Sequence, residues 1–228
     1  MNRALISSFF VKEDEIMNYS VIVLCAGIGQ RTGLDYNKMF YKFQDQTIYE
    51  MTLSHFVNDE RCKQIIVVCR EDEKEEFRKL YVNYKIEYVI GGRERQDSVY
   101  NGLKKVNQEY VFIHDGARPF IKKEHIDNLL ESVVNNKACL LMVSCTDTIK
   151  EVKDGKVVKT LKRENLMQAQ TPQVFLTSLV KEAYQKGIEN QFQATDDAQM
   201  VEMFSNQEIS IVIGDYDNKK VTTREDLK

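Results

Sequence analysis

The chain has 228 residues, 43% of them hydrophobic and 29% charged, and a net charge of −3 at pH 7, which suits a single domain with a full core. Acidic and basic residues are interspersed, and no apolar run approaches the roughly 20 residues that span a bilayer, which argues against nucleic-acid and membrane partners. The five cysteines lack metal-binding spacing and three lie in apolar runs (Cys25, Cys69 and Cys139), so we expect reduced thiols and a cytoplasmic protein.

The first 16 residues differ in character from the rest of the chain. Their apolar core, Leu5 to Val11, is too short for a signal peptide, and no small-residue cleavage site comes after it. We therefore treat residues 1–16 as an N-terminal extension of unknown role, and Met17 could be the true start. Residues 17–228 contain no linker, internal repeat or low-complexity segment, so we expect them to form one domain.

A strand and a small-residue loop open this domain. Residues 19–25 are rich in apolar and β-branched side chains without polar alternation, which predicts a strand buried on both faces. Ala26-Gly27-Ile28-Gly29 follows, and small residues let backbone N–H groups approach phosphate oxygens. Arg31 and Lys38 add two positive charges, so the segment suits a triphosphate. The alternative is a glycine turn with two solvated cations.

Two better-known phosphate loops do not fit this segment. A dinucleotide fingerprint needs glycine where the chain has Thr32, and no Gly-Lys-Ser/Thr of a P-loop is present. The same threonine argues against the hypothesis of a nicotinamide oxidoreductase.

Strands and helices then alternate along the chain. The patterns predict strands at 64–69, 86–90, 110–114 and 138–143, and helices from a Thr47 cap through Phe56 and at 71–81, 98–106 and 123–135. This order predicts an α/β fold with a doubly wound, mostly parallel, Rossmann-like sheet. Ligands of such sheets bind beyond the carboxyl ends of the strands, which here means after Cys25, Ile90 and His114.

The pattern changes after Thr146. Residues 148–161 form two short alternating runs around Asp154-Gly155, which predicts a β-hairpin. A hairpin is marginal alone, so we expect a projecting arm that meets a second subunit, giving a homodimer. Beyond it we expect a helix at 176–186, a helix from a Thr195 cap through Phe204, and a strand at 209–213.

Polar clusters lie at the ends of these strands. Residues 91–98, GGRERQDS, could read a base or hold phosphate, or Asp97 or Ser98 could simply cap a helix. Asp115 and Arg118 follow a buried strand and could act on a ligand or brace their own loop. His114 is expected to be a satisfied core histidine without a catalytic role.

Five cations accompany these clusters, and they favour one kind of chemistry. By default Arg163 and Lys220 are solvated charges, but with Arg31, Lys38 and Arg118 they form a cation-rich set against the single strand-end carboxylate of Asp115. Such a set favours phosphoryl-type transfer assisted by a phosphate-bound Mg²⁺.

Eight segments, in one order, carry a family resemblance. They are LCAGIGQR with Lys38, GGRERQDSV, HDGARPF, DTIKEV, TLKREN, QAQTPQVF, ATDDAQMVE and NKKVTTREDL. From about Tyr19 to Leu227 the chain resembles the 2-C-methyl-D-erythritol 4-phosphate cytidylyltransferases, which belong to the glycosyltransferase-A-like nucleotidyltransferases. The resemblance implies that CTP and the sugar-alcohol phosphate give a CDP-alcohol and pyrophosphate, with Mg²⁺, in non-mevalonate isoprenoid synthesis.

The resemblance also implies roles for individual residues. Arg31 and Lys38 would stabilise the transition state at the α-phosphate, Lys220 would orient the methylerythritol phosphate, and Thr148 and Arg163 would reach into the other subunit's site. Asp115, Arg118 and Thr171 would line the junction of the two substrates, with Asp115 also a candidate Mg²⁺ ligand. The residues expected to contact CTP are Ala26, Gly27, Gly29, Gly92 and Ser98.

One departure from the family bears on the loop. Family members usually have proline and glutamine around the catalytic lysine, where this chain has Asn37 and Met39, and the lost proline is expected to loosen the loop.

Two other readings stay open. Pentitol-phosphate cytidylyltransferases, which make CDP-ribitol, share the first loop but more often have Asp-Ala-Val-Arg-Pro, whereas here Ala117 precedes Arg118. A non-catalytic nucleotide-binding protein on the same fold is the reading from another class. Retention of Arg31, Lys38, Arg163 and Lys220 together argues against it.

Overall fold

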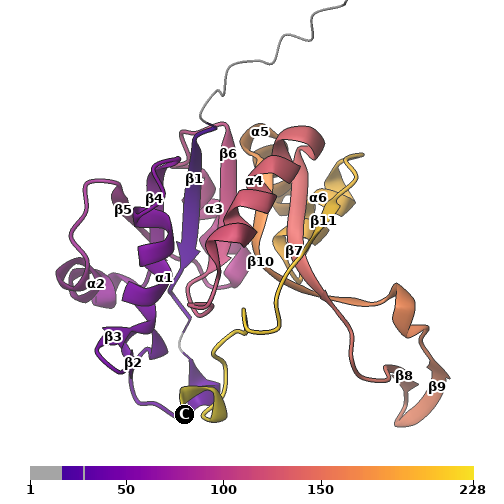
Figure 1. The fold of residues 1–228 in the computed structure, drawn as a ribbon. Coiled ribbons are helices and arrows are strands. Elements are labelled where there is room, and N and C mark those ends of the chain that lie inside the picture. The colour runs from indigo at the N-terminus through magenta and orange to yellow at the C-terminus, as the bar shows by residue number, and fades with distance from the viewer. Residues whose placement is uncertain (1–16, 28) are drawn as a thin grey trace, which may run out of the picture.

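A seven-stranded sheet forms the centre of the protein. The computed structural model describes residues 17–27 and 29–228, so the extension 1–16 lies outside it (Figure 1). Along the sheet the order is β11-β7-β10-β6-β1-β4-β5. Its strands are β1 (Tyr19–Leu24), β4 (Cys62–Cys69), β5 (Ile86–Ile90), β6 (Tyr110–Asp115), β7 (Ala138–Ser144), β10 (Met167–Leu176) and β11 (Ser210–Ile213). All neighbouring pairs are parallel except the two that β10 makes, which confirms the predicted α/β class with a mostly parallel sheet.

Helices cover both faces of the sheet. They are α1 (Ile48–Val57), α2 (Lys74–Leu80), α3 (Arg95–Leu103), α4 (Lys123–Asn136), α5 (Thr177–Glu189) and α6 (Asp197–Phe204). One core contains the apolar side chains of α1, α2 and α4, and the other those of α3, α5 and α6. Strand β1 contributes side chains to both cores, because Val21 and Val23 point to one and Ile22 to the other. This double burial explains why β1 has no polar alternation.

Strand β10 is an element that the sequence patterns did not predict. It runs antiparallel between β6 and β7, and its pairing with β7 is interrupted between Ala169 and Gln173. Its polar residues do not fit a strand pattern, yet Gln170, Thr171 and Gln173 are buried and have hydrogen-bond partners. The Gln170 amide donates to the Asp215 carbonyl (2.8 Å). The Gln173 side chain donates to Asp196 (2.9 Å) and accepts from the Ala198 N–H (2.8 Å). Side-chain hydrogen bonds thus replace the apolar pattern on which strand prediction depends.

The starts of α1, α4 and α5 agree with the patterns to within one residue, those of α2 and α3 do not, and the cap of α6 is a different residue. Thr47 caps α1 through a capping box with Glu50, as expected. Helix α6 is capped by Asp196, whose carboxylate accepts from the Gln199 N–H (2.9 Å), so the expected Thr195 cap is wrong. Helix α3 begins at Arg95, three residues before the predicted start.

Several short elements complete the chain. The segment expected as one helix over 71–81 divides into a 3₁₀ turn, η3 (Glu71–Glu73), and α2. A small unpredicted hairpin, β2 (Lys42–Phe43) and β3 (Gln46–Thr47), precedes α1. The other 3₁₀ turns are η1 (Gln30–Thr32), η2 (Lys38–Phe40), η4 (Arg163–Asn165) and η5 (Glu225–Leu227).

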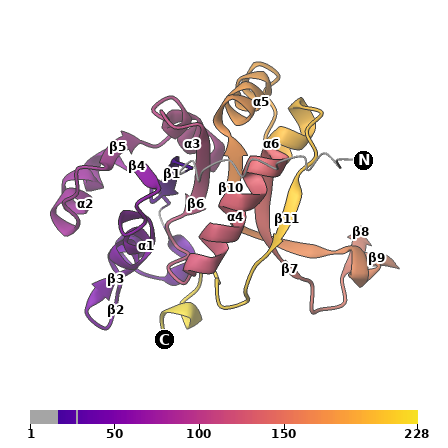
Figure 2. The same cartoon turned by 45° about the horizontal axis from the view of Figure 1, so that its top comes forward.

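The predicted hairpin arm is confirmed as a separate two-stranded sheet. Strands β8 (Lys150–Lys153) and β9 (Lys156–Thr160) are exposed throughout, and the arm extends away from the body in both views (Figures 1 and 2). Asp154 (φ 50°) and Gly155 (φ 74°) form its turn, in the left-handed conformations that two-residue hairpin turns require. Val152, Val157 and Val158 are 54–63% exposed. Over residues 17–27 and 29–228, no helix has the length and apolar content needed to cross a membrane.

Candidate active site

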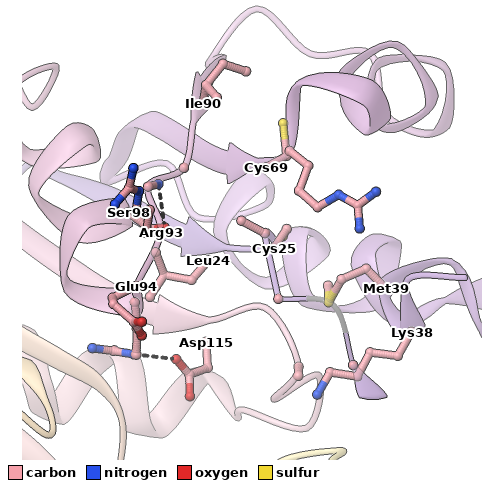
Figure 3. A pocket seen from close by; sticks show the side chains of 18 of the residues that line it. Leu24, Cys25, Lys38, Met39, Cys69, Ile90, Arg93, Glu94, Ser98 and Asp115 are labelled. Atoms are coloured by element: carbon pink, nitrogen blue, oxygen red, sulfur yellow. Dashed lines mark hydrogen bonds and ion pairs between the residues drawn. The ribbon is translucent and has the colours of Figure 1, made fainter. Parts of the chain in front are cut away.

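A cavity of about 830 Å³ opens at the carboxyl ends of the parallel strands. Its wall includes the residues that end four strands or directly follow them: Cys25 after β1, Cys69 at the end of β4, Ile90 at the end of β5, and Asp115 at the end of β6 (Figure 3). The three segments predicted to carry the ligand site therefore meet at one place. A cavity of this size accommodates a nucleotide.

The loop after β1 forms one side of the cavity. Ala26, Gly27, Gly29 and Arg31 all line it. Gly29 has φ 69°, a left-handed conformation that glycine adopts without strain. Thr32 closes the loop, because its hydroxyl (2.7 Å) and its backbone N–H (2.9 Å) both donate to the Gly29 carbonyl. The residue that breaks the dinucleotide fingerprint is thus a structural part of this loop.

Lys38 projects into the same cavity from η2. Its side chain extends toward the side where Asp115 lies (Figure 3), and its Nζ donates to the Val221 carbonyl at 2.7 Å. Burial, with the neighbouring Lys220 charge, lowers the pKa of the Lys38 amine, while Asp115 opposes that shift. Two lysines therefore face one region of the wall, where an anionic ligand would relieve their repulsion.

Asn37 corrects one expectation from the sequence. The loss of the family's proline was expected to loosen this loop, but Asn37 is buried and tethered on three sides. Its Nδ2 donates to the Cys25 carbonyl (2.9 Å) and to the Glu73 carboxylate (2.9 Å), and its Oδ1 accepts from the Met39 N–H (3.1 Å). The asparagine therefore joins the residue after β1 and the turn η3 to the turn that carries Lys38.

The glycine turn after β5 forms the opposite side. Gly92 and Ser98 line the cavity, and the Ser98 hydroxyl accepts from the Gly92 N–H at 3.0 Å. Asp97 accepts from the Glu94 N–H at 3.0 Å, so the capping that we considered as an alternative is also present. A Cβ atom on Gly91 would lie 2.9 Å from the Ala26 Cβ, which shows how closely the two loops approach.

Asp115 is the centre of the charged wall. Its Oδ2 pairs with Lys220 Nζ at 2.7 Å, and its Oδ1 accepts from Arg95 Nε at 3.3 Å. Burial alone would raise the pKa of the Asp115 carboxyl, but the Arg95 and Lys220 charges outweigh it and hold that pKa well below its ordinary value. The sequence patterns assigned Arg95 no role. Only its place in the polar segment 91–98 hinted at one.

The C-terminal segment brings Lys220 to this wall. The Val221 N–H donates to the Ala117 carbonyl (2.8 Å), and the Asn218 side-chain amide donates to the Thr171 carbonyl (3.0 Å). These bonds fix residues 218–221 beside the end of β6, across 104 positions of sequence in the first case and 47 in the second.

Arg118 and Thr171 lie behind the wall and do not line the cavity. Arg118 Nη1 donates to the Asn218 carbonyl at 2.6 Å, and the structure shows no ion pair between Arg118 and Asp115 among the described residues. The Thr171 hydroxyl accepts from the Asp115 N–H (3.0 Å) and contacts His114 Nδ1 (3.1 Å). Both residues support the end of β6, and their contact with a substrate stays a prediction.

His114 matches the expectation of a satisfied core histidine. It is fully buried, and its Nε2 lies 3.1 Å from the Arg118 carbonyl, which can only accept. Nε2 therefore carries the proton, and Nδ1 accepts from the Thr171 hydroxyl. Burial lowers the pKa of the His114 imidazole to about 3.

Thr148 and Arg163 lie at the two ends of the arm, exposed and outside their own chain's cavity. Arg163 Nη1 donates to the Thr146 carbonyl at 3.0 Å. The fold does not bring these two residues to the other candidate site residues of the same chain.

The comparisons with known proteins agree with this geometry. The model of the 2-C-methyl-D-erythritol 4-phosphate cytidylyltransferase family matches residues 19–228. Proteins of that name from Bacillus velezensis and Clostridioides difficile are 41% and 40% identical to the chain; each match covers 92% of this chain and 93% or 90% of the relative. Among solved structures, 4-diphosphocytidyl-2C-methyl-D-erythritol synthase from Anaerococcus prevotii superimposes with a TM-score of 0.82 at 30% identity, covering 93% of this chain and 96% of that one. The Francisella tularensis cytidylyltransferase gives 0.79 at 33% identity, covering 92% and 96%.

Proposed function

The chain belongs to the 2-C-methyl-D-erythritol 4-phosphate cytidylyltransferase family, and from this premise we propose that it transfers CMP from CTP to 2-C-methyl-D-erythritol 4-phosphate, releasing pyrophosphate. It is an enzyme of isoprenoid precursor synthesis. The observation that carries the proposal is the cavity at the strand ends, where Lys38, Lys220 and Arg31 face the space beside two glycine-containing loops.

The reaction asks the protein mainly to position reactants and stabilise charge. A phosphate oxygen of the sugar alcohol attacks the α-phosphorus of CTP, a new P–O bond forms, and the bond to the β-phosphate breaks as pyrophosphate leaves. Negative charge spreads over the phosphate oxygens during this step. Lys38 and Arg31 would stabilise it, and Lys38 would act from a fixed position, since its ammonium is already held by the Val221 carbonyl.

The two loops would bind the nucleotide. Ala26, Gly27, Gly29, Gly92 and Ser98 offer backbone groups and one hydroxyl to the base, ribose and phosphates. Lys220 would orient the acceptor phosphate, and its pairing with Asp115 fixes the position of its ammonium group.

Mg²⁺ is part of the proposal. The part of the chain that the structure describes contains no cluster of three histidine, cysteine or carboxylate side chains that could hold a metal. Mg²⁺ is usually bound by one or two carboxylates together with substrate phosphates. Asp115 supplies one carboxylate in the cavity wall, and its two oxygens also pair with Arg95 and Lys220, so the ion would share them. When bound, the ion would neutralise charge on the triphosphate, with Asp115 as its protein ligand.

We further propose a homodimer in which the arm completes the partner's site. The three exposed valines of the arm would be covered by a second copy across a two-fold axis. Thr148 and Arg163 lie outside their own cavity, which supports a role in another subunit's site. The five cysteines, all buried and unpaired, suit a cytoplasmic location.

Mixing two inactive variants tests the shared site. Lys38→Ala subunits mixed with Arg163→Ala subunits would form heterodimers with one intact site in two. If subunits exchange freely, about half of the dimers are mixed, so activity should recover to roughly a quarter of wild type. No recovery after independently confirmed exchange would place Arg163 in its own chain's site or in none.

The substrate is tested by direct competition. Methylerythritol phosphate and ribitol phosphate are assayed side by side with CTP, and pyrophosphate release is measured. The relatives from Bacillus velezensis and Clostridioides difficile carry the methylerythritol name, so we expect that substrate to be preferred. Preferred turnover of ribitol phosphate would overturn the assignment, and no turnover of either would favour a non-catalytic nucleotide-binding protein.

A further inference from the structure

We propose that Arg95 is a positioning residue of this site: anchored by Asp197 and Tyr184 from α6 and α5, it orients Asp115 and, through Asp115, Lys220. This inference rests on the proposed function, because the reaction is what the orientation serves. It gives a role to the ATDDAQMVE segment, which carries the family resemblance but to which the sequence assigned no chemistry.

Arg95 joins two carboxylates from different parts of the chain. Its Nη1 and Nη2 donate to the two oxygens of Asp197, at 3.0 and 2.7 Å, in a bidentate pair. Its Nε donates to Asp115 Oδ1 at 3.3 Å. The planar guanidinium is the side chain that can make both contacts from one rigid group, because its donors point in fixed directions.

Asp197 is an anchor that does not reach the cavity. It is fully buried at the start of α6, and the Tyr184 hydroxyl donates to its Oδ1 at 2.5 Å. The first turn of α6 is itself fixed to the sheet, since the Ala198 N–H donates to Gln173 of β10. The guanidinium is therefore held from the face of the sheet that α5 and α6 cover.

The consequence for the site is geometric. With Oδ1 of Asp115 held by Arg95, Oδ2 is turned toward Lys220, at 2.7 Å from its Nζ. A side chain that loses one of these two partners can rotate, and the Lys220 ammonium would move with it. A misplacement of about 1 Å in an active site can cost roughly 100-fold in rate.

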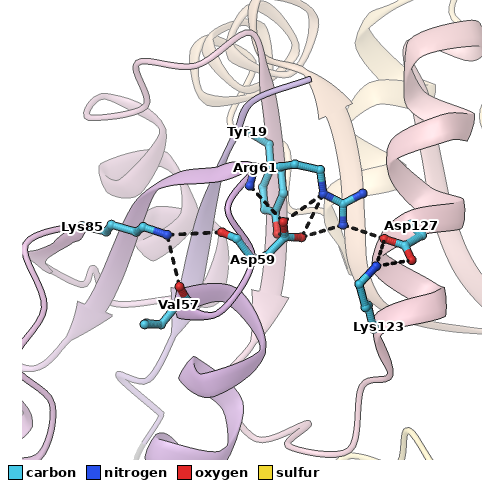
Figure 4. A network of polar contacts seen from close by, with 7 residues as sticks. All are labelled: Tyr19, Val57, Asp59, Arg61, Lys85, Lys123 and Asp127. Carbon is cyan, nitrogen blue, oxygen red and sulfur yellow. Dashed lines mark hydrogen bonds and ion pairs between the residues drawn. The ribbon is translucent and has the colours of Figure 1, made fainter. Parts of the chain in front are cut away.

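The protein contains a matched control at the opposite ends of the strands. There the Tyr19 hydroxyl donates to Asp59 (3.0 Å), Arg61 makes a bidentate pair with Asp59, and Arg61 also donates to Asp127 at 2.6 Å (Figure 4). This network uses the same side chains in the same order, tyrosine, aspartate, arginine and aspartate. Arg61 does not line the candidate active site.

The test compares Arg95→Lys with Arg61→Lys. Each keeps its charge and loses the planar guanidinium that joins two carboxylates. Because Asp197 is fully buried whereas Asp127 is 38% exposed, we expect the larger loss of thermal stability in Arg95→Lys, and activity is compared at a temperature where both variants are folded. For Arg95→Lys we expect kcat/KM for the sugar-alcohol phosphate to fall by about 10- to 100-fold, while the dissociation constant and stoichiometry of CTP binding stay near wild type. For Arg61→Lys we expect kcat/KM to stay within about twofold. An equal loss of kcat/KM in both variants, or no loss of kcat/KM in Arg95→Lys, would overturn the inference.

A double-mutant cycle tests whether Arg95 acts through Asp115. In an Asp115→Asn background Arg95→Lys should have little further effect, because the group that it positions is already altered. If the fold-losses in kcat/KM of the two single variants multiply in the double variant, Arg95 acts by another route and the inference fails. Should Arg95→Lys not fold, Asp197→Asn replaces it in the cycle with the same expected non-additivity.

The wild-type enzyme separates the two proposals. An inactive wild type in the same assay would refute the proposed function, and with it the role that rests on it. An active wild type whose Arg95→Lys variant is equally active would refute the positioning role alone.

Discussion

Replacement of Asn37 by alanine should destabilise the protein and misplace Lys38. The substitution removes the Met39 N–H···Oδ1 bond and the two bonds that Nδ2 donates, one of them to the Glu73 carboxylate. Glu73 is only 8% exposed, so water can replace the lost donor only in part. Burial already raises the pKa of the Glu73 carboxyl, although the Asn37 hydrogen bond opposes that rise.

The size of the effect can be estimated from these bonds. A neutral hydrogen bond contributes about 0.5–1.5 kcal/mol and one to a charged group about 1.5–3 kcal/mol, so two of the first kind and one of the second contribute about 2.5–6 kcal/mol. Because water replaces part of the lost bonding, we expect a loss near the lower end, about 3 kcal/mol. For a domain of this length, 1 kcal/mol shifts Tm by about 2–4 °C, which gives a decrease of about 6–12 °C. The kcat should fall as well, because the tether lies next to Lys38.

Thermal unfolding followed by circular dichroism measures the prediction, with Asn135→Ala as control. Asn135 is an exposed asparagine whose Nδ2 donates to the Glu131 carbonyl, and its loss should cost less than about 0.5 kcal/mol. Asn37→Asp sharpens the test, because it places a second carboxylate beside Glu73. The folded pair then binds a proton more readily than the unfolded chain, so the deficit relative to wild type should shrink as pH falls. An Asn37→Ala protein with the wild-type Tm would refute the tether.

Three further outcomes are expected. Lys38→Ala should lower kcat by about 10²–10³-fold with a much smaller effect on CTP binding, and a near-normal kcat with a raised KM would move Lys38 to ground-state binding. CTP should be used in preference to UTP, because the groups near Ala26, Gly92 and Ser98 can hydrogen-bond the edge of the base, and GTP and ATP should be excluded by size. Comparable turnover with GTP would refute this prediction. The pKa of His114 is about 3 in the folded protein, below its value in the unfolded chain. Between those two pH values the unfolded chain binds more protons, so the free energy of unfolding should decrease as pH falls, by at most about 1.4 kcal/mol per pH unit. Urea unfolding at several pH values should show this slope in wild type, and a His114→Gln variant with an unchanged slope would contradict it.

The parallel strands could be predicted because burial on both faces leaves a continuous apolar pattern in their sequences. Strands β1, β4 and β7 are buried on both faces, so they appear as continuous apolar runs. Strand β10 could not be found in this way, since its polar side chains are satisfied only by partners that the fold supplies, such as Asp196 and Asp215.

The candidate site could likewise be predicted only in part. The loops that directly follow strands converge as expected, because parallel strands end at one edge. Arg95 was missed because its bidentate partner, Asp197, lies 102 residues away in the sequence. The neighbouring caps Thr195 and Asp196 were confused because both side chains can accept the same kind of bond.

The position of β10 also matters while the chain is being synthesised. A ribosome releases β1, β4, β5, β6 and β7 before residues 167–176, yet β6 and β7 are neighbours only through the strand those residues form. Until then, the outer edge of β6 and the facing edge of β7 both present unpaired backbone groups, which can template association with other nascent chains. The middle of the sheet is therefore completed only once β10 has left the exit tunnel and can pair with both of these edges.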